Sequence, residues 1–333
     1  MKLSVLDLAP VVEGNTPRDA LLNARDLARH VERLGYHRFW MAEHHNMIGI
    51  ASAATSVALG FVAEGTNTIR IGSGGVMLPN HSPMIIAEQF GTLESLYPGR
   101  IDLGLGRAPG TDQRTLRALR RGPDSADQFP RDVQELQAFF AEVQPGQPIQ
   151  AVPGGGLNVP LWILGSSTFG AQLAGILGLP YAFASHFAPD ALMQALAAYR
   201  QRFEPSAQLQ SPYAMACVNV ICADTDAEAR RLFTSLQQAF VNMTRNTRGK
   251  MQPPIDDIET YWSGPEKAQA QHMLTYAFVG SPATVKRELQ EFVRVTGIDE
   301  LMVTGSIYDH QARLRSFELL AGIADDLYGD KAA

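Results

Sequence analysis

Two adjacent histidines, His44 and His45, directly follow a short apolar run. A neutral imidazole can donate and accept a proton near neutral pH, which suits general acid–base chemistry. Four further segments of chemically active residue types each follow an apolar run of their own: Gly74-Gly75, Arg107, Gly165-Ser166-Ser167 and His186. If the runs are parallel strands of one barrel, all five segments meet at one rim, where such barrels carry their chemistry. The alternative for the two histidines is an exposed ring beside a packed or capping one.

Arg107 and the turn Gly165-Ser166-Ser167 together have the chemistry of a phosphate site. The turn lies between a predicted strand and a predicted helix, so its backbone N–H groups and hydroxyls could bind an anion. A guanidinium group matches phosphate geometry and would supply the cation. Plain helix capping by the serines and a surface ion pair for the arginine are the alternatives.

Three glycines, Gly72, Gly74 and Gly75, interrupt the third apolar run. Glycine weakens a strand and often marks a bulge or a close approach by another backbone or a ligand. Either the barrel wall needs small residues here, or a flat ring lies against the backbone at Gly74-Gly75.

The elements that would position these residues alternate along the whole chain. Thr16 and Pro17 favour the start of a first helix, and Gly35 favours its end. Further helices are predicted at 51–63, 83–96, 125–142, 170–178, 190–203, 226–243, 282–296 and 311–327. The predicted strands are 3–7, 38–41, 69–77, 101–105, 161–164, 181–184, 214–222 and 300–304.

This alternation predicts an α/β chain folded as one (β/α)8 TIM-barrel domain over residues 1–333. An open doubly wound sheet is the alternative, but residues 8–14 lack the glycine-rich dinucleotide turn that it would need. Two insertions interrupt the alternation of predicted strands and helices. Residues 144–160 are rich in proline and glycine, and residues 244–271 are polar, contain Pro253-Pro254, and are predicted to be an irregular lid.

Composition narrows the class of protein. The net charge of −6 and the absence of a basic block argue against a nucleic-acid partner. No secretory signal or apolar run of membrane-spanning length is evident, which favours a cytoplasmic protein without membrane partners. Cys217 and Cys222 point to opposite faces of one predicted strand and cannot bridge each other. No cysteine–histidine cluster has zinc spacing, so the sequence predicts no metal site.

The order of five motifs resembles the bacterial luciferase-like family of flavin-dependent monooxygenases over essentially the whole chain. The motifs are Glu43-His44-His45, the run from Gly72 to Pro79, Ala87-Glu88-Gln89, Pro98-Gly99-Arg100 and the run from Gly104 to Arg107. The family's fold is a (β/α)8 barrel with an insertion. Luciferase itself has an acidic residue where this chain has Gly165 and a reactive cysteine where it has Gly106, which indicates a non-luminescent relative.

The resemblance implies a role for each motif. His44 would act catalytically at the reactive edge of the flavin, and His45 and His186 would line the flavin and substrate pocket. Gly74-Gly75 would form a non-prolyl cis peptide beneath the isoalloxazine ring. Arg107 and Gly165-Ser166-Ser167 would bind the FMN phosphate, and Glu88 would lie at the interface of a homodimer. The apolar helices 51–63 and 83–96 independently favour such a dimer.

The implied activity is oxygenation of a small organic substrate by dioxygen and reduced FMN, with a separate reductase supplying the flavin. Two alternatives stay open. A deazaflavin-dependent oxidoreductase could use the same fold for hydride transfer, and a flavin-binding protein could have lost turnover.

Overall fold

A ring of parallel strands forms the centre of the computed structural model, which describes residues 1–108, 112–247 and 249–327. The strand order is β6-β5-β4-β3-β2-β1-β9-β7-β8, and a further pairing of β6 with β7 closes the ring. The strands are β1 (Lys2–Asp7), β2 (Arg38–Met41), β3 (Arg70–Met77), β4 (Ile101–Gly106), β5 (Leu161–Gly165), β6 (Tyr181–Phe183), β7 (Ala214–Cys222), β8 (Ala277–Gly280) and β9 (Glu300–Thr304). The predicted TIM barrel is therefore confirmed.

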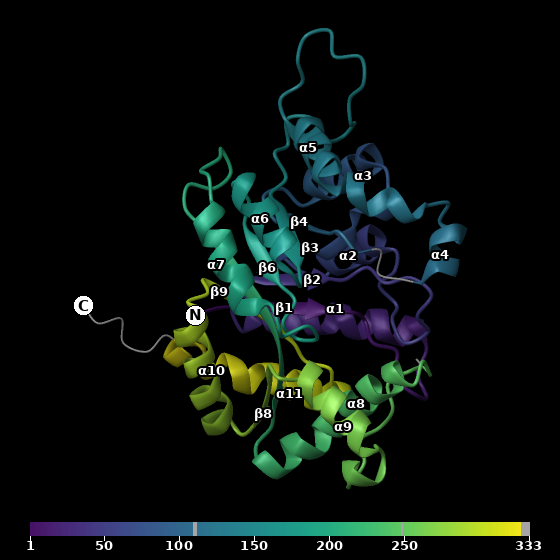
Figure 1. Ribbon diagram of the computed structural model, residues 1–333, viewed down its shortest axis with the longest axis vertical. Coiled ribbons are helices and arrows are strands. Elements are labelled where there is room, and N and C mark those ends of the chain that lie inside the picture. Colours follow the sequence, from purple (N-terminus) through teal and green to yellow (C-terminus); the bar gives the residue numbers. More distant parts are fainter. Residues whose placement is uncertain (109–111, 248, 328–333) are drawn as a thin grey trace, which may run out of the picture.

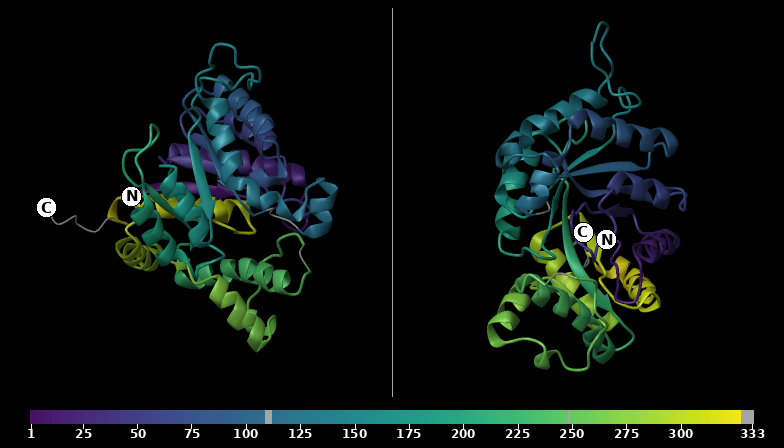
Figure 2. Two further views of the ribbon diagram at one scale, coloured as in Figure 1. Left: turned by 45° about the horizontal axis from the view of Figure 1, so that its top comes forward. Right: turned by 90° about the vertical axis from the view of Figure 1, so that its right-hand side faces the viewer.

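Helices surround the ring (Figures 1 and 2). They are α1 (Pro17–Arg33), α2 (Thr55–Ala63), α3 (Pro83–Leu96), α4 (Gln113–Ala118), α5 (Phe129–Phe140), α6 (Thr168–Ile176), α7 (Leu192–Arg202), α8 (Asp226–Thr244), α9 (Gly264–Met273), α10 (Pro282–Thr296) and α11 (His310–Ala321). Short 3-10 turns lie at Leu78–Asn80, Pro123–Gln128, Ile258–Thr260 and Ala324–Leu327. No helix of the described ranges combines the length and the apolar character needed to cross a membrane.

The first helix shows how local sequence sets these bounds. The Thr16 hydroxyl accepts a hydrogen bond from the Asp19 N–H, and the Asp19 carboxylate accepts one from the Thr16 N–H. This capping box satisfies two backbone donors that would otherwise lack partners. Gly35 follows the helix with a φ of +81°, a conformation that glycine adopts readily.

Three of the helices and strands were not predicted: α4, β8 and α9. β8 pairs with the end of β7 outside the closed ring and packs against α8 and α10 (Figure 1). α9 begins inside the segment 244–271 and ends just beyond it, so the prediction of a wholly irregular insertion is wrong there. Trp262 and Ala270 bury apolar surface against Val241 of α8, which gives this part of the segment a small core of its own.

The central part of the same segment is attached to the loops that follow β1 and β2. Met251 donates its N–H to Val11 O at 3.0 Å and accepts from the Glu13 N–H at 2.8 Å. A Cβ on Gly49 would lie 2.3 Å from Gly249 O, so the two backbones pass very close to each other. We call residues 249–251 the strap. Arg248, beside it, lies outside the described residues. Residues 141–160 form no helix or strand and project beside α5 (Figure 1).

A buried ionic network closes the end of the barrel at which the strands begin. The Arg38 guanidinium lies 2.6 Å from Asp102 and 3.0 Å from Glu300, and Arg70 lies 2.6 Å from Asp102. The Tyr213 hydroxyl donates to Glu300 at 2.7 Å. We call this network the floor. Removing one member of such a buried network typically costs about 3–5 kcal/mol, because its partner charge is left uncompensated.

The inside of the ring is filled by side chains, including Trp40 and Trp162, whose rings meet edge-on at 5.1 Å. A separate and larger core lies between the strands and the helices. Cys217 belongs to the inner cluster and Cys222 to the outer one, so the two thiols do face opposite sides of β7.

Candidate functional site

Most of the predicted site residues lie at or beyond the ends of consecutive parallel strands. His44 and His45 follow β2, Gly74-Gly75 lies within β3, and Arg107 follows β4. Gly165 ends β5, with Ser166 and Ser167 after it, and His186 follows β6. Because parallel strands of one barrel end at the same rim, these residues share one face of the molecule. Pro109 and Gly110, which complete the motif after Arg107, lie outside the described residues.

His44 and His186 interact across this rim. Burial, and after it the charge of His44, lower the pKa of His186 from its usual value to about 3. The Nδ1 atom of His186 is buried and has no hydrogen-bond partner in the described part of the chain. Its ring meets Phe187 edge-on at 4.8 Å, and Asn219 of β7 donates to its backbone oxygen at 2.6 Å. His186 therefore presents a neutral, fixed imidazole beside His44 at neutral pH.

The Gly74–Gly75 peptide is cis, which is the conformation that the resemblance implied at this position. Packing also favours glycine at both positions, and most strongly at Gly75, where the close atom belongs to the backbone. A Cβ on Gly75 would lie 2.7 Å from Gly104 O, and a Cβ on Gly74 would lie 2.7 Å from the Leu6 side chain. The barrel wall therefore accounts for glycine at both positions without any ligand. Gly74 stays half-buried, so its backbone is accessible from the rim.

Arg107 lies beside the first turn of α6. Its guanidinium carbon is 4.2 Å from the centre of the Phe169 ring, the second residue of that helix. Ser166 and Ser167 are exposed, and Ser167 occupies the N-cap position without a side-chain capping hydrogen bond. The alternative role of Ser167 in helix capping is therefore not used here. Exposed hydroxyls, helix N–H groups and a half-buried arginine at one place fit a phosphate group.

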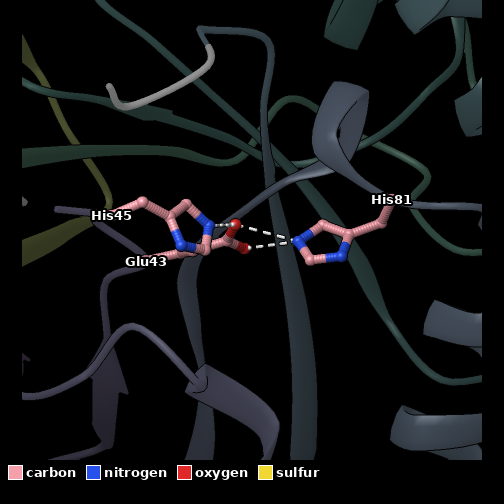
Figure 3. Close-up of side chains that lie close together, drawn as sticks. All are labelled: Glu43, His45 and His81. Atoms are coloured by element: carbon pink, nitrogen blue, oxygen red, sulfur yellow. Dashed lines mark hydrogen bonds and ion pairs between the residues drawn. The ribbon is translucent and has the colours of Figure 1, made fainter. Parts of the chain in front are cut away.

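His45 joins Glu43 and His81 in a further group of side chains (Figure 3). Its Nε2 lies 2.6 Å from Glu43 Oε1, and His81 Nε2 lies 2.8 Å from the same oxygen. The Met77 N–H donates to the other carboxylate oxygen of Glu43 at 3.0 Å. Burial alone would raise the pKa of the Glu43 carboxyl, but the hydrogen bonds from His81, His45 and the Met77 N–H hold it below its usual value. We call Glu43, His45 and His81 the triad.

Sequence reasoning did not single out His81. The residue follows the 3-10 turn Leu78–Asn80 and lies 38 positions from Glu43 along the chain. Its place in the triad depends on the pairing of β2 with β3. The only sequence signal was the predicted adjacency of these two strands, which brings residues beyond their ends together.

Comparisons with known proteins show the family of the chain. Residues 1–300 match a family model described as "Luciferase-like monooxygenase". The chain is 57% identical to a luciferase-like monooxygenase of Escherichia coli over 98% of both chains. It is 32% identical to an N-acetyl-S-alkylcysteine monooxygenase of Bacillus subtilis, covering 96% of this chain and 97% of that protein.

Solved structures show the same fold. Apo-MsnO8 is 38% identical and superposes with a TM-score of 0.89 over 97% of this chain and 98% of its own. The oxygenating constituent of a 3,6-diketocamphane monooxygenase from Pseudomonas putida, in complex with FMN, is 19% identical with a TM-score of 0.73, covering 96% and 97%. An F420-dependent secondary alcohol dehydrogenase is 15% identical with a TM-score of 0.69, again covering 96% and 97%. The last two show the fold alone.

Proposed function

Because the chain belongs to the luciferase-like monooxygenase family, we propose that it is an FMN-dependent monooxygenase acting on a small organic substrate. A separate reductase supplies reduced FMN. One atom of dioxygen enters the substrate, the other leaves as water, and reduced FMN provides two electrons. The observation that carries this proposal is the placement of Arg107 beside the exposed serines that begin α6, on the rim that also holds His44 and His186.

Arg107, Ser166 and Ser167 would hold the phosphate of FMN. The accessible backbone at Gly74 would lie against the ring system, as in the resemblance. Hydrogen bonds between a charged guanidinium and phosphate are among the stronger polar contacts in proteins, so these residues would contribute much of the selectivity for FMN over riboflavin.

His44 would exchange a proton with the reacting groups at the rim. Its neighbour His186 stays neutral near pH 7, so it can give or accept a hydrogen bond without adding a fixed positive charge. The strap lies against the loops after β1 and β2 and would limit the access of water to the rim.

The test is anaerobic titration with reduced FMN and with reduced riboflavin. Arg107→Ala should weaken FMN binding by at least about 1.5 kcal/mol, roughly tenfold, and leave riboflavin binding nearly unchanged. Arg202→Ala is the matched control, because Arg202 is exposed at the far end of α7. Equal weakening of both flavins would show that Arg107 is structural.

The same titration with a deazaflavin, and oxygen consumption in air, separate the alternatives. Tighter binding of a deazaflavin such as F420 than of FMN would favour hydride transfer without oxygen. Tight FMN binding with no oxygen consumption beyond free flavin, across a panel of small substrates, would favour a flavin-binding protein without turnover.

We further propose a homodimer formed through α2 and α3. Of the apolar side chains that favoured this interface, Leu59, Val62, Ile86, Phe90 and Leu93 are buried within the barrel's own core. Val57 and Ile85 remain 74% and 50% exposed. A groove of about 610 Å³ beside them is lined by Leu21, Leu22, Ala54 and Phe61, among others. This smaller apolar surface supports the proposal.

A further inference from the structure

The triad brings three ligand atoms of complementary type to one point. The Nε2 atoms of His45 and His81 and a carboxylate oxygen of Glu43 all lie within 4.8 Å of one another. Both imidazoles present the same nitrogen and turn it toward the same carboxylate (Figure 3). No role in the proposed oxygenation requires this convergence, since the acid–base residue proposed there is His44.

The donor set is one that divalent transition metals prefer. Two imidazole nitrogens and one carboxylate oxygen are a common protein set for zinc sites with an open position. The same set in other geometries binds iron, so ligand type alone indicates a first-row divalent ion rather than Mg²⁺ or Ca²⁺.

The two distances from the imidazole nitrogens to the carboxylate oxygen need little change to hold such an ion. With metal–ligand bonds of about 2.0–2.1 Å, tetrahedral ligand atoms lie about 3.3 Å apart. The two nitrogens lie 2.6 and 2.8 Å from Glu43 Oε1, so each would retreat by roughly half an ångström or slightly more. The side chains of His45 and His81 are 18% and 28% exposed, which leaves them room to move and gives an ion a route in.

The surrounding backbone already fixes the buried ligand. Glu43 is 2% exposed, and the Met77 N–H holds its Oε2 at 3.0 Å. The backbone N–H of Glu43 also donates to Gly75 O at 3.3 Å. A hydrogen bond to the second carboxylate oxygen is the kind of outer contact that orients metal ligands, and it leaves Oε1 directed at the imidazoles.

We propose that Glu43, His45 and His81 form a binding site for one divalent transition-metal ion of the Zn²⁺ type. The ion replaces the shared hydrogen bonds of the triad and ties the end of β2 to the turn that follows β3. The proposal does not depend on flavin, so it is tested with the full-length chain before any flavin is added.

The experiment titrates chelator-treated protein with Zn²⁺ by calorimetry and with Co²⁺ by visible absorption. We expect one ion per chain and a Co²⁺ spectrum typical of nitrogen and oxygen ligation at low coordination number. His81→Gln and Glu43→Gln should each weaken Zn²⁺ binding by at least about tenfold. His272→Gln is the matched control: His272 lies 2.8 Å from Asp190, but in the described ranges this pair belongs to no three-ligand cluster.

Two outcomes would overturn the proposal. The first is no stoichiometric binding of either ion up to about 100 µM, the weak end of specific affinities. The second is wild-type affinity in His81→Gln, which would place any bound ion elsewhere and leave the triad as a hydrogen-bonded structural group. If Glu43→Gln fails to fold, the result for His81→Gln decides alone, because His81 is a partly exposed loop residue.

Discussion

Acidification should destabilise the fold through the buried imidazole of His186. Burial, followed by the charge of His44, lowers the pKa of this group to about 3 in the folded protein. The unfolded chain therefore takes up the proton first as the pH falls, near the usual histidine value of about 6.5. The contribution of the neutral His186 ring to the free energy of unfolding is therefore fully present above about pH 6.5. It is lost progressively as the pH falls toward 3.

The size of the effect follows from the pKa difference. Between pH 7.5 and pH 5.0 the unfolded state gains about 2 kcal/mol relative to the folded state from this one group. Urea unfolding at the two pH values measures the change. His186→Phe keeps a flat ring against Phe187 but cannot take up a proton. Between the two pH values, the free energy of unfolding of this variant should therefore fall by about 2 kcal/mol less than that of the wild type.

Titrating groups that do not interact with His186 cancel in this comparison, so His44 is the one group whose own titration the substitution can also change. Burial also lowers the pKa values of His30 and His37, but both residues are present in the two proteins. Glu43 and the carboxylates of the floor are likewise unchanged. The same loss of unfolding free energy in wild type and variant would refute the reasoning and would mean that the His186 ring is hydrated in the native state.

Three further predictions concern the rim, the surface and the strap. His44→Ala should leave the affinity for reduced FMN within a few fold of the wild-type value. It should slow substrate oxygenation by about 100- to 10,000-fold, because a proton donor and acceptor is lost. Unchanged turnover on an established substrate would exclude this role. The double variant Val57→Asp with Ile85→Asp should be a monomer when its mass is measured by light scattering. The control Val295→Asp, at a residue of α10 that is 48% exposed, should keep the mass of the wild-type dimer. A monomeric wild type would exclude the dimer. Gly49→Ala places a Cβ 2.3 Å from Gly249 O and should push the strap from the loop after β2. Hydrogen peroxide release per reduced FMN consumed should then rise, and an unaltered ratio would argue against a covering role for the strap.

Most of the barrel could be predicted from the sequence, because its strands are buried on both faces and appear as continuous apolar runs. The strand β8 was missed because Ala277–Gly280 lies outside the ring and only alternate residues of it are buried, so it forms no continuous apolar run. The helix α9 was missed because Gly264 and Pro265 suggest a turn, and its face is mostly polar. Its only buried residue in the helix span is Ala270, so no apolar stripe was present to indicate it.

The candidate site was predictable where its residues follow strands and not where they follow turns. Arg107 and the serines before α6 stand next to apolar runs, so topology alone brings them to the rim. His81 follows Leu78–Asn80, a turn whose path depends on tertiary contacts. His45 has the same residue type as its neighbour His44, and sequence could not show that the two rings would take separate surroundings.

The floor has a consequence for how far the opposite end of the barrel can vary. Arg38, Arg70 and Glu300 are the first residues of their strands, whereas His44, Arg107 and His186 come after the last. The charges that close the ring therefore lie at the opposite end of the strands from the residues that would meet a ligand. A combinatorial library randomised in the loops after β2, β4 and β6 should keep many folded members, while one randomised at the floor should keep few. Such a chain can change its ligand by small steps without first losing its architecture.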